Sequence, residues 1–310
     1  MPKIHRHLRP KSSDAPFKKN EKVASFVKTS VKPAQPTTKQ GSFKPKAAFK
    51  TASIAAKKAA VVPASTSWGG VAEWYDNYLE TNKDSYQEMV IAPNMLRLLD
   101  IKKGMRMLDV ACGQGFFTRK FAAAGANIVG ADISKELTDQ AKKRSPNIAF
   151  HASPAHLLPF AKDASVDAVT IILAIQNIEN ITDVFKEINR VLVPGGRLLM
   201  VLNHPLYRVP KRSSWGFDEA AKVQFRRIDG YLSARTAPIL MHPGQKESEA
   251  TISYHRSLQD FFKALSKNGF AVSRLEEWIS HKKSGAGPRQ VAEDTARKEI
   301  PLFMMLEART

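Results

Sequence analysis

Cysteine and long apolar runs are the features that this 310-residue sequence most clearly lacks. It contains a single cysteine, which excludes an internal disulfide and a CxxC metal site and suits a reducing compartment. No apolar run reaches the roughly 18–20 residues that a membrane span needs. The N-terminus is basic but has no apolar signal core, so we do not expect secretion. The expectation is a cytoplasmic protein without a metal site.

Acidic residues are scarce in the first 66 residues, which contain 15 Lys or Arg but only two acids. Seven prolines interrupt any helix there and the phenylalanines are scattered, so we expect residues 1–66 to form a disordered basic tail. One interpretation is an arm that contacts nucleic acid or a ribosome through phosphates. The others are a solvated extension and a cleaved targeting peptide, although the excess of Lys over Arg argues against a transit peptide.

The remaining residues, 67–310, alternate short apolar runs with helical patterns. Apolar strands that are bounded by Gly, Pro and Asp and separated by helices are typical of a parallel sheet covered on both faces. The pattern therefore predicts a doubly wound α/β domain. The expected strands are 106–111, 127–132, 148–151, 167–174 and 196–204, and the expected helices are 115–124, 135–145 and 184–193.

The motif MLDVACGQGFF lies where the first expected strand ends and a helix begins. Ligands of doubly wound sheets bind beyond the carboxyl ends of the strands. Gly113 and Gly115 would let the backbone approach such a ligand, and the helix N-terminus would offer free N–H groups. Asp109 would face the same crevice, and Asp132, which ends the second strand, could accept hydrogen bonds from ribose hydroxyls. A nicotinamide-binding domain would use GxGxxG here, but Thr118 occupies the third glycine position.

Asp109, the CGQG loop and Asp132 together resemble the motifs of class I S-adenosylmethionine-dependent methyltransferases, in the type 11 group of methyltransferase domains. The resemblance extends over roughly residues 69–203 and more loosely beyond. It implies a Rossmann-like, seven-stranded, mostly parallel sheet with an antiparallel last strand, and S-adenosyl-L-methionine as the cofactor. Further matching stretches are LPF at 158–160, VDAVTIILAIQNIEN at 166–180 and FKEINRVLVPGGRLLMV at 185–201.

The resemblance assigns cofactor-binding roles to the residues after the first two strands. Asp109 would hold the methionine part of the cofactor, together with the loop formed by Gly113, Gln114 and Gly115. Asp132 would bind the ribose, and the next residue, Ile133, would flank the adenine. Two alternatives stay open, since Asp132 could only cap the end of its strand and Asp109 could only organise the glycine loop.

The resemblance is weaker on the adenine side of the expected site. The family usually has an acid after the third strand, but this chain has Pro154 at that position. Ser153 or a main-chain carbonyl would then receive the adenine amino group. The residues expected to line the sulfonium and the acceptor mouth, or to close over the cofactor, are Leu173, Ala174, Gln176 and Tyr75. Leu173 and Ala174 could equally belong to the core.

Residues 204–256 exceed an ordinary strand-to-helix connection and are expected to form a lid over the acceptor. His204 follows the fifth strand directly, and His255 precedes a helix with a Ser257–Asp260 capping box. Each histidine is either a general base for a hydroxyl acceptor or a structural residue, and an amine acceptor needs no base. The basic residues of the lid, which indicate either an anionic acceptor or a solvated loop, are Arg208, Lys211, Arg212, Arg226, Arg227 and Arg235.

These observations predict a methyltransferase that acts on an oxygen or nitrogen atom of an unidentified acceptor. We favour a small molecule, because the chain lacks the Asn/Asp-Pro-Pro-aromatic tetrapeptide of many nucleobase amine methylases. The alternatives are an RNA- or ribosome-associated methyltransferase, which the basic tail favours, and a non-catalytic nucleic-acid-binding module on the same fold. Cys112 is interpreted as a packing residue, since methylation of a pyrimidine carbon typically uses a nucleophilic cysteine from a different loop.

Overall fold

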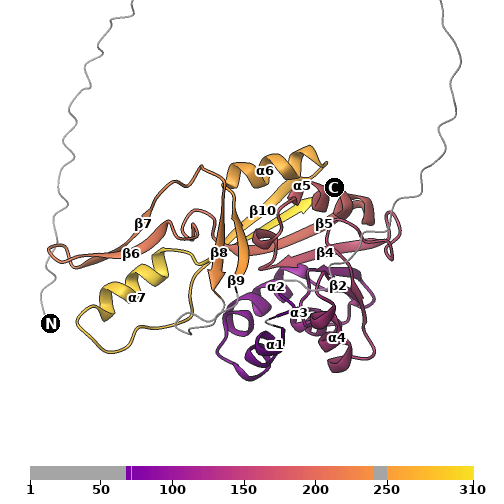
Figure 1. Ribbon diagram of the computed structural model, residues 1–310, viewed down its shortest axis with the longest axis horizontal. Helices are drawn as coiled ribbons and strands as arrows, with labels where there is room; N and C mark the ends of the chain where they lie inside the picture. The colour runs from indigo at the N-terminus through magenta and orange to yellow at the C-terminus, as the bar shows by residue number, and fades with distance from the viewer. Residues whose placement is uncertain (1–67, 71, 241–249) are drawn as a thin grey trace, which may run out of the picture. The chain divides into compact units, whose positions relative to one another are not determined.

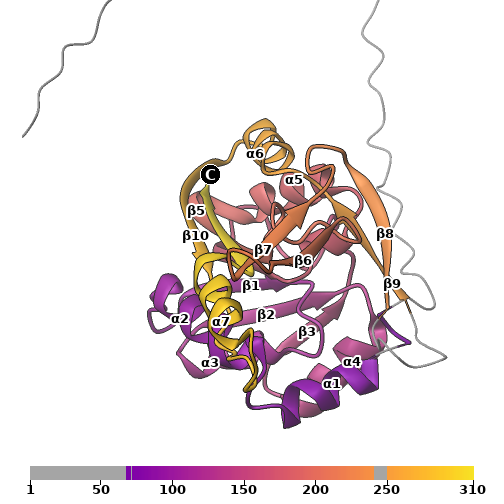
Figure 2. The same cartoon turned by 90° about the vertical axis from the view of Figure 1, so that its left-hand side faces the viewer.

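The computed structural model describes residues 68–70, 72–240 and 250–310; the expected basic tail at 1–66 lies outside the described residues. One sheet contains the strands β1 Arg106–Val110, β2 Asn127–Asp132, β3 Ala149–Ala152, β4 Val166–Ile172, β5 Leu192–Asn203, β10 Ala271–Trp278 and β11 Phe303–Arg309. Their order is β10-β11-β5-β4-β1-β2-β3 (Figures 1 and 2). β11 is antiparallel to both of its neighbours, and the other pairs are parallel. This confirms the predicted α/β fold with a mostly parallel sheet.

The strand order reverses at the centre of the sheet. β2 and β3 lie on one side of β1, whereas β4 and β5 lie on the other side. Loops that leave the carboxyl ends of β1 and β4 therefore turn away from each other and leave a crevice between them. This topology places a ligand site directly beside the CGQG loop, which follows β1.

Helices cover both faces of the sheet. They are α1 Ala72–Thr81, the π-helix η1 Gln87–Ile91, α2 Ala92–Leu99, α3 Phe116–Ala123, α4 Lys135–Arg144, the 3₁₀ turn η2 Ile175–Asn177, α5 Ile181–Val191, α6 Leu258–Lys267 and α7 Gln290–Glu299. Leu198 and Met200 of β5 pack in one core with α5 and α6, while Leu199 and Val201 pack in the other with α2 and α3. Because successive side chains of a strand point to opposite faces, a wholly apolar strand is buried on both.

The predicted lid contains regular structure that the sequence analysis did not anticipate. β6 Ser213–Asp218 pairs with β7 Val223–Ile228, and β8 Arg235–Leu240 pairs with β9 Ala250–His255. Each hairpin is a separate two-stranded sheet, and an isolated hairpin is only marginally stable in water. The hairpins therefore depend on their neighbours: α7 contacts β7 (Figure 1), and β9 contacts η2.

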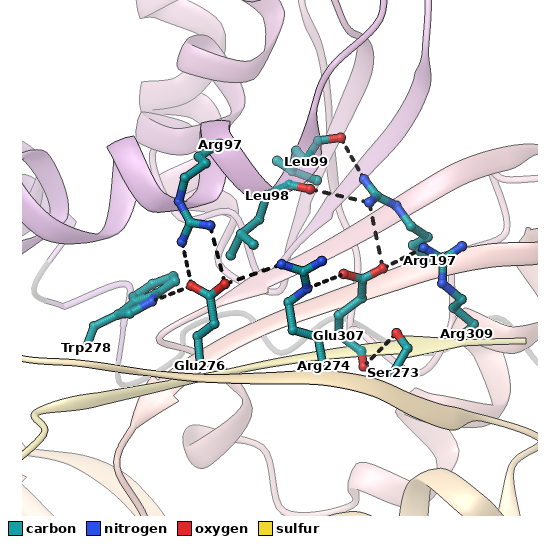
Figure 3. Close-up of polar contacts among 10 residues, drawn as sticks. All are labelled: Arg97, Leu98, Leu99, Arg197, Ser273, Arg274, Glu276, Trp278, Glu307 and Arg309. Carbon is teal, nitrogen blue, oxygen red and sulfur yellow. Dashed lines mark hydrogen bonds and ion pairs between the residues drawn. The ribbon is translucent and has the colours of Figure 1, made fainter.

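A network of arginines and carboxylates ties β5 and β11 to α2 (Figure 3). Arg197 donates hydrogen bonds to the carbonyls of Leu98 and Leu99, at 3.3 and 2.6 Å. These carbonyls end α2 and have no partner within the helix. The Glu307 carboxylate, which is buried, forms ion pairs with Arg309 at 2.9 Å and with Arg197 at 3.7 Å. Arg274 adds a third ion pair to Glu307, at 3.7 Å. Arg197 thus joins the buried Glu307 to the end of α2, which fixes α2 against the sheet.

Candidate functional site

A cavity of about 270 Å³ lies at the carboxyl ends of β1, β2 and β4, and we refer to it as the first cavity. Its walls come from the loops that follow these strands, in agreement with the strand order. Gly115 belongs to the same loop as two lining residues but does not itself line the cavity. The predicted cofactor residues that do line it are Asp109, Gly113, Gln114, Asp132, Ile133, Ser153, Leu173 and Ala174.

The glycine loop needs its glycines for two different reasons. Gly113 and Gly115 both have positive φ values, 57° and 81°, a region that side chains disfavour. A Cβ atom at Gly115 would also lie 2.9 Å from the ring of Phe150 on β3. The loop thus packs tightly against the sheet while its Gly113 N–H points to Asp132, whose Oδ2 accepts that hydrogen bond at 2.8 Å.

Asp132 ends β2 and is held by backbone donors on both carboxylate oxygens. Its Oδ1 accepts from the Ser134 N–H at 2.9 Å, and its Oδ2 accepts from Gly113. Only 7% of the residue is exposed. Burial raises the pKa of this carboxyl above its ordinary value, and the backbone N–H donors act in the opposite direction. Each oxygen can accept a second hydrogen bond, so the two sites that ribose hydroxyls require are present.

Asp109 lies deeper in the first cavity, on β1. Its two oxygens accept hydrogen bonds from the hydroxyls of Thr118 on α3, at 2.6 Å, and Thr170 on β4, at 2.8 Å. Burial raises the pKa of Asp109 to about 6, against the two threonine hydrogen bonds that lower it. Asp109 therefore connects three elements of the fold and also supplies a carboxyl group that is close to its titration point at neutral pH.

Cys112 also lines the first cavity but does not have the properties of a nucleophile. Burial, together with the charges of Asp109 and Asp132, raises the pKa of its thiol well above the ordinary value. A thiol that stays protonated is a poor nucleophile. Its Sγ lies where a Cβ at Gly130 of β2 would approach within 2.9 Å, which is consistent with the predicted packing role.

The rim of the first cavity comes from the segments after β3 and β4. The Ser153 hydroxyl donates to the Leu157 carbonyl at 2.6 Å and retains its acceptor sites. Leu173 adopts a φ of 55°, and its N–H donates to the Val201 carbonyl at 2.7 Å. A positive φ in a leucine indicates local strain, of the kind that clusters at functional sites. Tyr75 lies in α1, but its side chain is outside the described part of the chain.

His204 lies at the end of β5, where both of its ring nitrogens are engaged. Nε2 bonds to Glu277 at 2.6 Å, and Nδ1 accepts the Leu206 N–H at 3.3 Å. The residue is 2% exposed and lines neither cavity described here. Desolvation lowers its pKa, with the neighbouring Glu277 carboxylate acting in the opposite direction. With both ring nitrogens engaged, His204 has no free lone pair unless these bonds rearrange.

His255, at the end of β9, differs from His204 in having one nitrogen available. Its Nε2 is 2.7 Å from the carbonyl oxygen of Tyr231, and a carbonyl can only accept, so Nε2 carries the hydrogen. The neutral ring then keeps its lone pair on Nδ1, to which no described residue donates. His255 lines a second cavity, where this lone pair could act as a base.

The second cavity has a volume of about 410 Å³ and lies beside the carboxyl end of β5. Gln176, which was expected near the sulfonium, lines this cavity rather than the first. No described residue lines both cavities, and the short turn η2 separates them. Of the six predicted lid cations, three line the second cavity: Arg208, Lys211 and Arg226. Arg227 instead forms an ion pair with Asp229 at 3.0 Å.

Comparison with known proteins identifies the domain that contains the first cavity. The family model described as a methyltransferase domain matches residues 108–200. The crystal structure of an S-adenosylmethionine-dependent methyltransferase from Mesorhizobium loti is similar with a TM-score of 0.56 at 26% identity, covering 70% of this chain and 96% of that one. This chain carries a class I S-adenosylmethionine-dependent methyltransferase domain. The predicted family and cofactor are thereby confirmed.

Curated relatives match this methyltransferase domain over part of their length. Demethylmenaquinone methyltransferase of Paenarthrobacter aurescens is 38% identical over 109 residues, which cover 35% of this chain and 43% of that protein. Demethylmenaquinone methyltransferase of Chlorobaculum parvum is 35% identical over 130 residues, which cover 41% of this chain and 54% of that protein. The chain thus spans about half the length of these relatives.

The sequence analysis missed some residues that line the methyltransferase domain's cavities. Trp68 lines the first cavity, while Trp215 and Arg256 line the second. Arg256 directly follows the candidate base His255, and this proximity is the one signal that could have pointed to it. Among the described residues there is no group of three or more His, Cys, Asp or Glu placed to hold a metal ion. No helix in those residues has the length and apolarity to cross a membrane.

Proposed function

We propose that this protein transfers the methyl group of S-adenosylmethionine to an oxygen or nitrogen atom of a small-molecule acceptor. The observation that carries the proposal is the Asp132 carboxylate, which ends β2 beside the glycine loop and lines the first cavity. The names of the curated relatives support a small acceptor, since demethylmenaquinone is a small molecule.

In this proposal the residues of the first cavity bind and orient the cofactor. Asp132 accepts the ribose hydroxyls, Ile133 contacts the adenine, and the Ser153 hydroxyl accepts from the adenine amino group. Asp109, with the loop of Gly113, Gln114 and Gly115, faces the methionine part, whose ammonium group complements a buried carboxylate. The bound cofactor supplies an electrophilic methyl group on a sulfonium.

The acceptor side of the reaction needs positioning, exclusion of water and, for a hydroxyl, a base. Leu173 and Ala174 form an apolar wall of the first cavity, on the side of η2. We assign the base to His255, because its Nδ1 lone pair is not engaged by another described residue. His204 would first have to give up its bonds to Glu277 and Leu206. An amine acceptor would need neither histidine.

Calorimetric titration with S-adenosylhomocysteine tests the cofactor site directly. Asp132→Ala removes two charge-assisted acceptors, so affinity should fall by about 2–3 kcal/mol, or roughly 30–150-fold. Asp139→Ala is the matched control, because Asp139 is a half-exposed carboxylate on α4 that pairs with Lys135 and does not line the first cavity. Unchanged affinity in Asp132→Ala would contradict the placement of the ribose.

A transfer assay tests the reaction itself. The full-length protein is incubated with cofactor that carries a tritiated methyl group and with cell extract separated into protein, RNA and small-molecule fractions. We expect label in the small-molecule fraction. Label confined to RNA would instead support the RNA- or ribosome-associated alternative, and label in no fraction would favour a non-catalytic module.

A further inference from the structure

The second cavity has an unusual charge distribution. Four cationic side chains and no acidic one stand among the described residues that line it. The cations are Arg208, Lys211, Arg226 and Arg256, and they come from three segments that are distant in sequence. Like charges that line one cavity repel each other, and an anion bound between them would reduce this repulsion.

Several polar groups of the second cavity have no partner in the protein. The side chains of Arg208 and Lys211, two exposed residues, form no hydrogen bond or ion pair with any described residue. Arg256 donates through Nη2 to the Glu179 carbonyl, but its Nη1 is buried without a partner. The Gln176 Oε1 is also buried without a partner. Buried polar groups are rarely left unpaired in folded proteins, which indicates that a ligand or water pairs with the Arg256 and Gln176 atoms. The exposed Arg208 and Lys211 are free to bind an anion that enters the cavity.

Contacts within the protein hold the Arg226 side chain at the second cavity. Arg226 donates to the Tyr207 carbonyl at 2.9 Å and to the Ser213 hydroxyl at 2.7 Å, and its guanidinium lies 5.0 Å from the centre of the Trp215 ring. Desolvation and the neighbouring charge of Arg208 lower the pKa of Arg226. Arg208 and Arg226 line the same cavity, and planar guanidinium matches the oxygens of carboxylate and phosphate.

The second cavity adjoins the first through η2. Ala174 and Asn177 line the first cavity, while Gln176, between them in the chain, lines the second. The Asn177 amide donates to the Ile252 carbonyl of β9 at 2.8 Å, which fixes β9 against this turn. A ligand held in the second cavity would therefore lie next to the wall that faces the methyl group. The apolar lining residues, which include Trp215 and Phe261, suit a ligand with an apolar body.

We infer that the second cavity binds an oxyanion group, carboxylate or phosphate, of an acceptor that also has an apolar or aromatic body. The inference rests on the proposed function for its description of the ligand as an acceptor. The anionic oxygens are bound by Arg208, Lys211 and Arg256. Arg226, on β7, attracts the same anionic group from the side of the β6–β7 hairpin. The Gln176 Oε1 accepts a hydrogen bond from a donor group of the same ligand. Recognition of the anionic group positions the acceptor beside the first cavity.

Titration of the full-length protein with simple probes tests this inference. The probes are benzoate, phenyl phosphate and the neutral analogue benzamide, with binding followed by calorimetry. Benzoate or phenyl phosphate should bind saturably and benzamide at least about 10-fold more weakly, because it lacks the charge. Whichever anion binds more tightly identifies the oxyanion of the acceptor. Equal binding of benzamide and the anions, or no binding of either anion, would overturn the inference.

Two variants and a matched control place the binding in the cavity. Arg208→Met and Lys211→Met should each lower the affinity for the preferred anion. For Arg208→Met the affinity should fall by about 10-fold or more. Lys263→Met removes the same charge from an exposed position on α6, outside the cavity, and should leave affinity unchanged. Equal effects in Arg208→Met and Lys263→Met would show general charge attraction and overturn the inference. Thermal melting of each variant verifies the fold, and Lys211→Met keeps the test valid if Arg208→Met unfolds.

Titration with S-adenosylhomocysteine separates this inference from the proposed function. Arg208→Met should bind S-adenosylhomocysteine like the unmodified protein, since Arg208 does not line the first cavity. Cofactor binding without anion binding would overturn the anion site and leave methyl transfer standing. Anion binding without cofactor binding would retain the anion site and remove the proposed function, together with the description of the ligand as an acceptor.

Discussion

The two cavities differ in whether their charged side chains are paired within the protein. In the first, Asp109 accepts hydrogen bonds from two threonines and Asp132 accepts them from two backbone N–H groups. In the second, Arg208 has no partner among the described residues and Arg256 has an unpaired, buried Nη1. The carboxylates of the first cavity are therefore paired within the protein, whereas the cations of the second keep donor groups that an anion could engage.

This difference in pairing determines how each cavity recognises its ligand. A cavity whose polar groups are already paired binds one ligand in one orientation at little cost of rearrangement, which suits a constant cofactor. A cavity with unpaired charges gains its binding energy from the ligand's own charge and discriminates against ligands that lack it. Mutations in the two cavities should therefore affect different steps of the reaction.

The largest expected effect concerns the base in the second cavity. If a hydroxyl acceptor transfers its proton to His255, His255→Ala should lower turnover by about 10²–10⁴-fold. Cofactor affinity should stay near that of the unmodified protein, because His255 does not line the first cavity. Turnover is measured with the acceptor fraction that the transfer assay identifies, and cofactor affinity by calorimetry.

His204→Ala is the comparison variant for the base. His204 is buried and bonded to Glu277 and to the Leu206 N–H, so its removal should cost about 1–3 kcal/mol of stability. Turnover of the folded variant should fall far less than in His255→Ala. If His204→Ala melts like the unmodified protein but its turnover falls by 10²-fold or more, the general base is His204 rather than His255.

The contrast between the cavities also explains how much the sequence could predict. Asp109, the glycine loop and Asp132 lie within 24 consecutive residues, at the ends of adjacent strands. Local patterns of apolar strand, glycine and acid therefore predicted the first cavity. The second cavity joins Gln176, Arg208 and Arg256, which come together only through tertiary packing. Sequence spacing contains no information on that packing, so Arg256 was missed.

The fold shows the same division between local and tertiary information. The helices predicted at 115–124 and 135–145 are confirmed as α3 and α4, with ends displaced by a residue or so. The hairpins β6–β7 and β8–β9 were missed, because their exposed strands lack a continuous apolar run. α7 was missed as well, since only Ala296 of this helix is buried and a mostly exposed helix has a weak apolar pattern.

The tight packing of the glycine loop against β3 can be tested by comparing alanine substitutions at two glycines. Gly115→Ala combines a positive φ with a Cβ placed 2.9 Å from Phe150, so it should destabilise the fold by about 2–5 kcal/mol and weaken cofactor binding. Gly195→Ala is matched in φ, at 75°, but its Cβ meets no atom within 4 Å. That variant should lose only about 1–2 kcal/mol. Denaturant unfolding of both measures the contact, and equal losses would show that Phe150 moves aside.

Asp109 should lower stability at neutral pH. Its pKa is raised from 3.8 to about 6 in the folded protein, so between these values the folded state holds more protons than the unfolded state. The free energy of unfolding therefore falls as pH rises through this window, by about 3 kcal/mol in total. Asp109→Asn removes this cost and keeps polar atoms for Thr118 and Thr170. We expect it to be more stable than the unmodified protein at pH 7.5 but not near pH 4, in denaturant unfolding with Asp139→Asn as control.

The smallest expected effect is the pH dependence of cofactor affinity. A carboxylate at Asp109 attracts the cofactor's ammonium group, and a protonated carboxyl does not. With a pKa of about 6 in the free protein, roughly nine-tenths of Asp109 is protonated at pH 5, so affinity should be about 10-fold weaker there than at pH 7.5. In Asp109→Asn the affinity should be weak at both pH values and lose this dependence, whereas Asp139→Asn should retain it. An unmodified protein whose affinity does not change between pH 5 and 7.5 would show that Asp109 only organises the loop through Thr118 and Thr170, without acting on the cofactor's charge.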